Sequence, residues 1–239
     1  MIDGKRVLVV VPARGGSKGV PLKNLHPLAG KPLIVHTGEL VQQLTFVDRA
    51  VVSTDYEEIA RVSQECGLDA PFTRPEELSG DLIGDTEVLC HALSECERLD
   101  GTTYHVVVML QPTCPLRRPE HVLAVVEELV RRNWDAVWTV TQTDLKYHPL
   151  KQLSIGENGA LTLFDPRGRG IIARQQLRKT FIRNGAAYAI TGECLLEQRT
   201  TLGENSGAVV IEEPMVSIDT LLDFAAVESV LTMRKANSK

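Results

Sequence analysis

A glycine-rich segment close to the start of the chain carries residues that suit the binding of a polyanion. Residues 13–24 read Ala-Arg-Gly-Gly-Ser-Lys-Gly-Val-Pro-Leu-Lys-Asn and follow the apolar run 7–11. Glycines let backbone N–H groups approach a phosphate closely, and Arg14, Lys18 and Lys23 add positive charge. The spacing matches neither the Walker A pattern nor the dinucleotide fingerprint. The segment therefore predicts a phosphate-binding loop of another kind, with a solvated glycine-rich turn as the alternative.

Two carboxylates near the C-terminus are the best acidic candidates for a metal site. A triphosphate substrate needs Mg²⁺ to offset its charge during phosphoryl or nucleotidyl transfer. Asp219 follows residues 215–218, which we predict to be a late strand, and a carboxylate at the end of a strand suits a metal ligand. The alternatives are that Asp219 caps the last helix and that Asp223, one turn further on, is solvated.

Other polar residues suggest binding roles with less specificity. Arg174 and Gln175 follow the loop-like stretch 166–170, and arginine offers a planar fork for a carboxylate or phosphate. An exposed loop arginine is the alternative. Gln111 ends a buried run, where a polar side chain must find a partner. Cys114 lies between two prolines, but the sequence offers no identifiable His or Asn partner for a catalytic thiol.

Composition excludes several classes of protein. The 239 residues are 43% hydrophobic and 24% charged, which is typical of a globular chain with ample core. A formal net charge of −5 argues against general nucleic-acid binding. No apolar run approaches membrane-spanning length, and the first residues lack a signal-peptide pattern. We therefore expect no association with a membrane. The five cysteines form no CxxC pair, so we expect buried thiols in a reducing cytoplasm.

The elements that must position these residues alternate along the first 140 positions. Their rhythm predicts an α/β fold with a doubly wound, mainly parallel sheet, in which ligands sit at the carboxyl ends of strands. The glycine-rich segment, residues 53–55 and residues 111–117 all follow predicted strands, so we expect them to meet at one edge. Apolar runs predict strands at 6–12, 49–53, 104–110 and 135–141, and helical periodicity predicts helices at 32–44, 56–66, 85–99 and 119–132.

The alternation of predicted strands and helices ends after about residue 143. Two short apolar segments flank Gly-Glu-Asn-Gly at 156–159, which predicts a β-hairpin of 151–155 and 160–164. A hairpin cannot be part of a parallel crossover, so this stretch is expected to project from the sheet. We expect a single domain, residues 1–239, with 143–180 as a projecting excursion. The remaining predictions are strands at 184–190 and within 209–218, and an amphipathic helix at 220–233.

An ordered set of motifs resembles the N-acylneuraminate cytidylyltransferases, also called CMP-sialic acid synthetases, a family that includes synthetases of the CMP-legionaminic and CMP-pseudaminic type. Each motif alone would be weak, but the set keeps the family's order and spacing between about residues 7 and 233. The matching segments are 12–19, 23–24, 52–55, 74–78, 111–117, 148–151, 174–177, 184–188 and 218–220.

The resemblance implies a Rossmann-like nucleotidyltransferase fold and a reaction of CTP with a nine-carbon 2-keto sugar acid. The anomeric hydroxyl would attack the α-phosphorus in line, giving the CMP-sugar and pyrophosphate with Mg²⁺ or Mn²⁺ as cofactor and no covalent enzyme intermediate. It also implies a homodimer, in which 143–180 packs on the partner and helps to close its site.

The resemblance further assigns roles by position. Residues for the nucleotide would be Ala13, Arg14, Gly15, Ser17, Lys23, Asn24, Arg74, Ile83, Asp85 and Gln111. Residues for the sugar acid would be Gln111, Thr113, Cys114, Lys151, Arg174, Gln175 and Tyr188. Catalytic residues would be Arg174, Lys23 and Arg14, and the metal ligand would be Asp219.

The sequence departs from the family's pattern in three respects. Ser217 stands where a first aspartate is expected before the last helix, and Thr200 with Thr201 replaces bulky aromatics that pack the N-acyl group in some members. Asp85 stands where small hydroxyl residues are common, and it could accept a hydrogen bond from the 4-amino group of cytosine. A nucleotidyltransferase for a sugar 1-phosphate, and a nucleotide-binding homologue that has lost catalysis, are the competing interpretations. The sequence leaves the identity of the acid open.

Overall fold

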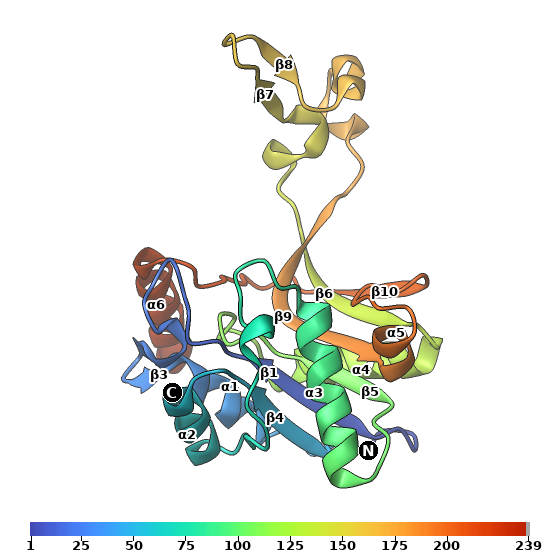
Figure 1. Ribbon diagram of the computed structural model, residues 1–239. Coiled ribbons are helices and arrows are strands. Elements are labelled where there is room, and N and C mark those ends of the chain that lie inside the picture. Colours follow the sequence, from blue (N-terminus) through green and yellow to red (C-terminus); the bar gives the residue numbers. More distant parts are fainter. Residues whose placement is uncertain (238–239) are drawn as a thin grey trace.

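A six-stranded, mainly parallel sheet forms the centre of the computed structural model, which describes residues 1–237 (Figure 1). The strand order is β10-β6-β9-β5-β1-β4. Strands β1, β4 and β5 are mutually parallel, as are β6 and β10, whereas β9 runs antiparallel to β5 and β6. The predicted fold class is confirmed. The strands are β1 (Val7–Pro12), β4 (Arg49–Ser53), β5 (Val106–Met109), β6 (Ala136–Gln142), β9 (Phe181–Thr191) and β10 (Ser206–Val210).

The apolar run of β1 explains why helices cover both faces of the sheet. Successive strand residues point to opposite faces, and Val9 packs in one core cluster while Val10 packs in the other. The first cluster lies under α1 (Leu33–Val41), α2 (Glu57–Glu65) and α4 (Pro119–Arg132). The second lies under α3 (Asp85–Asp100) and α5 (Gly192–Leu196), so the sheet is doubly wound.

Residues 143–180, which we call the arm, join the antiparallel neighbours β6 and β9. The arm contains the predicted hairpin, with β7 (Leu153–Ile155) paired to β8 (Leu161–Leu163). Figure 1 shows the arm standing clear of the sheet and its helices. The prediction that this segment projects is confirmed. Short 3₁₀ helices complete the arm: η3 (Leu145–Tyr147), η4 (Pro149–Lys151), η5 (Pro166–Gly170) and η6 (Arg174–Gln176).

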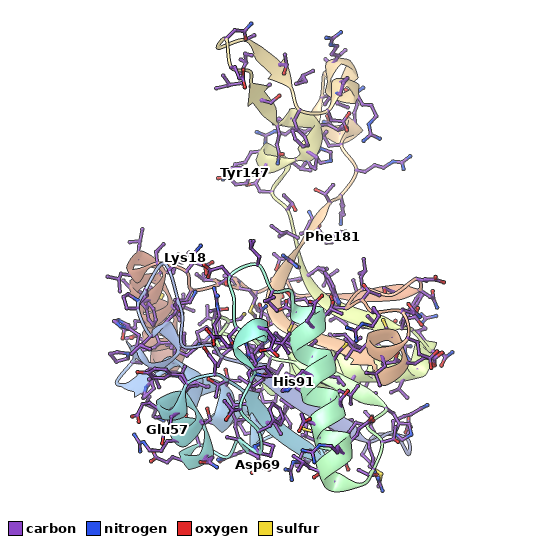
Figure 2. All side chains as sticks on the ribbon, viewed as in Figure 1. Lys18, Glu57, Asp69, His91, Tyr147 and Phe181 are labelled. Carbon is purple, nitrogen blue, oxygen red and sulfur yellow. The ribbon has the colours of Figure 1, made fainter. Side chains whose placement is uncertain are left out.

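The arm leaves most of its apolar side chains uncovered. Ile155 is 74% exposed, Phe164 68% and Ile172 94%, while Leu177 is the one buried hydrophobic residue between 143 and 180. Figure 2 shows the arm's side chains spread around a thin ribbon. Exposed apolar side chains gathered on one short segment mark a place where another surface is expected to pack.

The prediction of a strand at 215–218 is wrong. The last strand is β10, and the chain then crosses the carboxyl edge of the sheet, where the Ile218 N–H donates to the Thr113 carbonyl at 2.8 Å. Pro214 lacks an N–H group and cannot extend a ladder. The closing helix α6 (Leu221–Asn237) packs Phe224 and Val227 against the stretch that follows the glycine-rich segment.

Two further observations bear on the sequence-based expectations. All five cysteines are free and buried, as predicted. Within the described residues, none of the helices combines the length and the apolar character needed to span a membrane.

Candidate functional site

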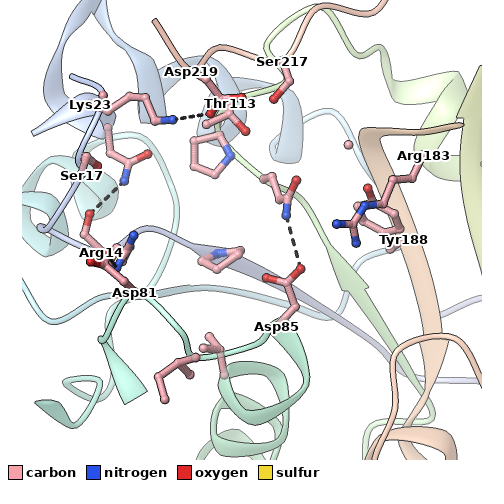
Figure 3. A pocket seen from close by; sticks show the side chains of 18 of the residues that line it. Arg14, Ser17, Lys23, Asp81, Asp85, Thr113, Arg183, Tyr188, Ser217 and Asp219 are labelled. Carbon is pink, nitrogen blue, oxygen red and sulfur yellow. Dashed lines mark hydrogen bonds and ion pairs between the residues drawn. The ribbon is translucent and has the colours of Figure 1, made fainter. Parts of the chain in front are cut away.

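A cavity of about 960 Å³ opens at the carboxyl ends of the central strands (Figure 3). The glycine-rich segment and the segment around Gln111 both line it, so these two predicted neighbours meet there. Residues 53–55, the third predicted member, do not line the cavity, whereas the stretch before α6 does. Most of the predicted site residues lie on its wall: Arg14, Ser17, Lys23, Asn24, Arg74, Ile83, Asp85, Gln111, Thr113, Tyr188 and Asp219.

The glycine-rich segment is fixed by hydrogen bonds to the end of β4. The Ala13 N–H donates to the Ser53 carbonyl at 2.9 Å, and the Gly15 N–H donates to Asp55 Oδ1 at 2.8 Å. Both N–H groups therefore already donate hydrogen bonds within the protein, and neither residue lines the cavity. The expectation that Ala13 and Gly15 contact the nucleotide is not supported. Asn24 lines the cavity, and its Nδ2 also holds the loop by donating to the Arg14 carbonyl at 3.1 Å.

Two loop cations share one carboxylate that sequence analysis overlooked. Asp81 accepts from Arg14 Nη1 at 2.7 Å through one oxygen and from Lys18 Nζ at 2.7 Å through the other. The hydrogen bonds from Lys18 and then Arg14 hold the pKa of Asp81 below its usual range. Asp81 thus keeps both cations turned into the mouth of the cavity. Its available signal in the sequence was its place three residues after the family motif at 74–78.

The third loop cation ties the glycine-rich segment to the stretch before α6. Lys23 Nζ donates to the Ile218 carbonyl and to Asp219 Oδ1, both at 2.9 Å. A Cβ on Gly19 would lie only 2.4 Å from the Asp219 carbonyl oxygen, so this close approach requires glycine. The contacts bring a lysine, a carboxylate and a glycine backbone together although 200 residues of sequence separate them.

The cap of α6 leaves the Asp219 side chain free for the cavity. Asp223 Oδ2 accepts from the Thr220 N–H at 2.7 Å, and the Asp223 N–H donates back to Thr220 Oγ1 at 3.3 Å. This reciprocal pair is a capping box. Thr220 rather than Asp219 therefore caps the helix, and Asp223 is a capping residue rather than a merely solvated one.

The opposite end of the cavity is enclosed by Arg74 and Asp85. The Arg74 guanidinium is buried; its Nε donates to Ser53 Oγ at 3.0 Å, and burial lowers its pKa to about 10. Asp85 accepts a long hydrogen bond from Gln111 Nε2 at 3.5 Å. Burial raises the pKa of Asp85, against the opposing effect of Arg183 and then Arg74. This end therefore holds a desolvated carboxylate beside an apolar wall of Ile83 and Val88.

Replacement of Asp85 by asparagine is expected to stabilise the fold at neutral pH. Folding raises the pKa of the Asp85 carboxyl, so ionisation of Asp85 lowers the free energy of unfolding. This loss of stability is absent below the pKa of Asp85 in the unfolded chain, and it is complete above the raised pKa of the folded protein. The melting temperature should rise by about 2–4 °C at neutral pH, and the gain should shrink as the pH falls toward about 4. Scanning calorimetry across this range measures it. Glu127→Gln, at an exposed position of α4, is the control, and a gain independent of pH would contradict the assignment.

Four predicted sugar-site residues do not reach the cavity of their own chain. Lys151, Arg174 and Gln175 lie on the arm and are absent from the cavity wall (Figures 1 and 2). Cys114 is fully buried; its Sγ donates to the Asn184 carbonyl at 3.4 Å, and burial raises the pKa of the thiol. The expectation that Cys114 contacts a sugar is not supported, because no part of its side chain reaches solvent.

Sequence analysis also missed Arg117 and Arg183. Arg117 is buried, and its guanidinium donates to the carbonyls of Cys114 and Gln111, which shapes the loop carrying Gln111. Arg183 lies on β9 and lines the cavity. It directly precedes the motif at 184–188, and this charged position beside a motif was the available signal.

Comparison with known proteins decides the family. Residues 8–178 match the protein family described as Cytidylyltransferase, which is well over half of the chain. The chain belongs to this family. Two relatives support the assignment along almost the whole length, so the resemblance inferred from the motifs is confirmed.

The first relative of the cytidylyltransferase is CMP-N,N'-diacetyllegionaminic acid synthase of Legionella pneumophila, 31% identical over 235 residues, with 96% of this chain and 98% of the relative covered. The second is pseudaminic acid cytidylyltransferase of Campylobacter jejuni, 30% identical over 217 residues, with 90% and 92% covered. A solved structure of CMP:2-keto-3-deoxy-manno-octonic acid synthetase complexed with CTP matches with a TM-score of 0.70 at 18% identity. The match covers 96% of this chain and 100% of the solved chain, which establishes that the two proteins share a fold.

Asp219 is the carboxylate of the cytidylyltransferase that best suits a metal ion at the phosphate end of the cavity, because Asp81 uses both of its oxygens for Arg14 and Lys18. In the part of the chain that the structure describes, no three His, Cys, Asp or Glu side chains gather as a complete metal site. Asp219 is 74% exposed and uses one oxygen for Lys23. Mg²⁺ commonly takes one or two carboxylates and completes its shell with waters and substrate phosphates. The residues present therefore fit a metal ion that arrives with a triphosphate.

Proposed function

We propose that this cytidylyltransferase transfers the CMP group of CTP to the anomeric hydroxyl of a nine-carbon 2-keto sugar acid and releases pyrophosphate. The observation that carries the proposal is a single cavity with three loop cations at one end and a partly buried carboxylate, Asp85, at the other. The names of the two relatives, a legionaminic acid synthase and a pseudaminic acid cytidylyltransferase, support an acid of this class.

The phosphate end would bind the triphosphate by charge and position. Carboxylates hold the side chains of Arg14, Lys18 and Lys23 in place. These side chains therefore lose less conformational entropy when the substrate binds. Fixed cations stabilise the negative charge that develops on phosphate oxygens during transfer. These residues would therefore favour in-line attack mainly by orientation and electrostatics, without a covalent intermediate.

The base end would select cytosine. As a carboxylate, Asp85 accepts a hydrogen bond from an exocyclic amino group, whereas the corresponding carbonyl of uracil would face it with repulsion. A site built around such a hydrogen bond rejects the analogue that lacks the donor steeply. Ile83 and Val88 add an apolar wall beside it. The cavity thus favours CTP over UTP.

Asp219 would hold Mg²⁺, or Mn²⁺, together with the phosphates. When bound, the ion would neutralise charge on the triphosphate and on the departing pyrophosphate. Lys23 would keep the Asp219 carboxylate oriented toward the triphosphate through the 2.9 Å ion pair. Ser217, which also lines the cavity, would supply a hydroxyl where a second carboxylate is expected.

The arm would complete the site of a second copy of the chain. Its exposed apolar residues need a covering surface, and a homodimer in which each arm packs on the partner supplies one. The arm would then carry Lys151, Arg174 and Gln175 to the partner's cavity. On this view 1–239 is one catalytic domain with a dimerisation arm at 143–180. The buried free cysteines fit a reducing cytoplasm as the compartment.

The test is pyrophosphate release with a matrix of substrates. Each nucleoside triphosphate is combined with legionaminic, pseudaminic, sialic and deaminated sialic acids, and with sugar 1-phosphates. Release is expected only with CTP and at least one of the acids, and the rates identify the preferred acid. Turnover of a sugar 1-phosphate would favour the other class of nucleotidyltransferase. No release with any acid would favour a binding protein without catalysis.

A further inference from the structure

Arg183 differs from every other cation of the cavity in having no partner. Arg14 and Lys18 are paired with Asp81, Lys23 with Asp219, and Arg74 with the serine at the end of β4. Among the described residues, the Arg183 guanidinium makes neither a hydrogen bond nor an ion pair, although it lines the same cavity. An arginine held in a cavity without a counter-ion is an available site for an anion.

The backbone that carries Arg183 is fixed. Arg183 pairs with Val140 of β6 next to an irregularity of the ladder. There the Asn184 side chain accepts from Thr139 Oγ1 at 2.7 Å and donates to Thr141 Oγ1 at 3.0 Å. Irregularities of this kind re-aim side chains near functional sites. Arg183 therefore belongs to the sheet, a few residues after the end of the arm, and it lies at the cavity although the arm stands away from it.

The Arg183 side chain reaches toward the cavity centre from the wall opposite the glycine-rich loop. Figure 3 shows its guanidinium beside Tyr188 and directed inward, facing the side on which Lys23 and Arg14 lie. Its positive charge acts on both Asp85 and Tyr188, but no Asp85 oxygen lies within ion-pair distance. The three loop cations thus form one cationic site, and Arg183 forms a separate one; Arg74, the remaining cation of the cavity, is buried and bound to Ser53.

The chemistry of the acceptor calls for two such sites. In a 2-keto sugar acid the anomeric carbon bears both the reacting hydroxyl and the carboxylate, so in-line attack brings the carboxylate within a few ångströms of the triphosphate. Two anions at that separation repel each other strongly where water is largely excluded. A cation on the wall away from the phosphates can bind the carboxylate bidentately and fix the orientation of the hydroxyl.

We infer that Arg183 binds the carboxylate of the sugar acid. The inference rests on the proposed function and deepens it, because it assigns the acid-binding side of the cavity to a residue of the same chain as the phosphate loop. Arg183 is then a substrate-binding residue that also sets specificity for an acid over its neutral derivatives.

The experiment compares wild type, Arg183→Ala, Arg183→Lys and Arg6→Ala with the free acid and with its neutral carboxamide. Arg6 is an exposed arginine before β1, away from the cavity. Arg183→Ala is expected to lower kcat/KM for the acid by about 10²-fold. The preference of the wild type for acid over amide should largely disappear in this variant. Affinity for CTP, measured by calorimetry without acid, should change less than about twofold. Arg183→Lys should recover part of the loss, and Arg6→Ala should behave as wild type.

Each outcome decides between alternatives. Unchanged acid kinetics in a folded Arg183→Ala variant, or an unchanged preference for acid over amide, would overturn the inference while leaving the proposed function in place. Weaker CTP binding with intact acid preference would assign Arg183 to the nucleotide instead. A wild-type enzyme that turns over no sugar acid would refute the proposed function and the inference with it.

Discussion

Asp219→Ala is expected to lower kcat/KM by on the order of 10³-fold and to remove the dependence of the residual rate on Mg²⁺. The carboxylate is largely exposed at the phosphate end of the cavity, with one oxygen on Lys23 at 2.9 Å and no hydrogen bond to the other oxygen among the described residues. Its loss removes both an oxygen ligand and the anchor of a phosphate-binding lysine. The measurement is a Mg²⁺ titration of the initial rate, supported by Mn²⁺ binding followed by electron paramagnetic resonance with CTP present.

Asp223→Ala is the matched control for this prediction. Asp223 lies four residues further on and caps α6, so its loss should reduce stability by about 1 kcal/mol and leave the Mg²⁺ dependence intact. Ser217→Asp should tighten the apparent affinity for Mg²⁺, because a second carboxylate adds a hard anionic ligand. A wild-type rate and Mg²⁺ dependence in Asp219→Ala would show that the metal is held elsewhere.

Mixing two inactive variants is expected to restore activity if the arm serves the partner's cavity. Arg174→Ala removes an arm arginine, and Lys23→Ala removes a cavity lysine; each homodimer should lose at least about 10²-fold in kcat/KM. In a heterodimer of the two, one cavity keeps its own Lys23 and receives an intact arm. One of the two sites in each heterodimer is then intact, so the purified heterodimer should have about half of the wild-type activity. Activity of co-expressed, differently tagged variants after two-step purification measures this.

The control is a mixture of Arg174→Ala with Lys151→Ala. Both changes lie on the arm, so every heterodimer has a damaged arm at each cavity and no activity should return. If the arm instead folded over the cavity of its own chain, mixing Arg174→Ala with Lys23→Ala would also restore nothing. That result, with dimers present, would contradict the proposed exchange of arms.

The sequence was sufficient for features that depend on local pattern. The run 7–11 predicted a central strand because it is apolar at every position, and its residues do pack on both faces of the sheet. The hairpin at 153–163 followed from turn residues between two short apolar segments. The stretch 215–218 is apolar except at Ser217, but its burial comes from α6 and the neighbouring loops rather than from a ladder. Composition alone does not distinguish those two kinds of burial.

Site residues could be predicted where they belong to a sequence motif, but contacts between segments far apart in the sequence could not. Lys23 was identified from its loop, but its ion pair with Asp219 spans 196 positions of sequence. Asp81 reads as an ordinary loop acid until the fold brings it to Arg14, 67 residues earlier. Arg183 reads as an exposed strand residue, and its significance comes from its lack of a partner between residues 1 and 237, in a cavity whose other cations are paired.

Product analysis by ³¹P NMR and mass spectrometry tests the central claim most directly. The enzyme is incubated with CTP, Mg²⁺ and the preferred acid from the substrate matrix. The account predicts one pyrophosphate for each CTP consumed, together with a phosphodiester whose mass equals CMP joined to the acid with loss of water. Free CMP with no sugar attached, or pyrophosphate released at the same rate without the acid, would contradict it.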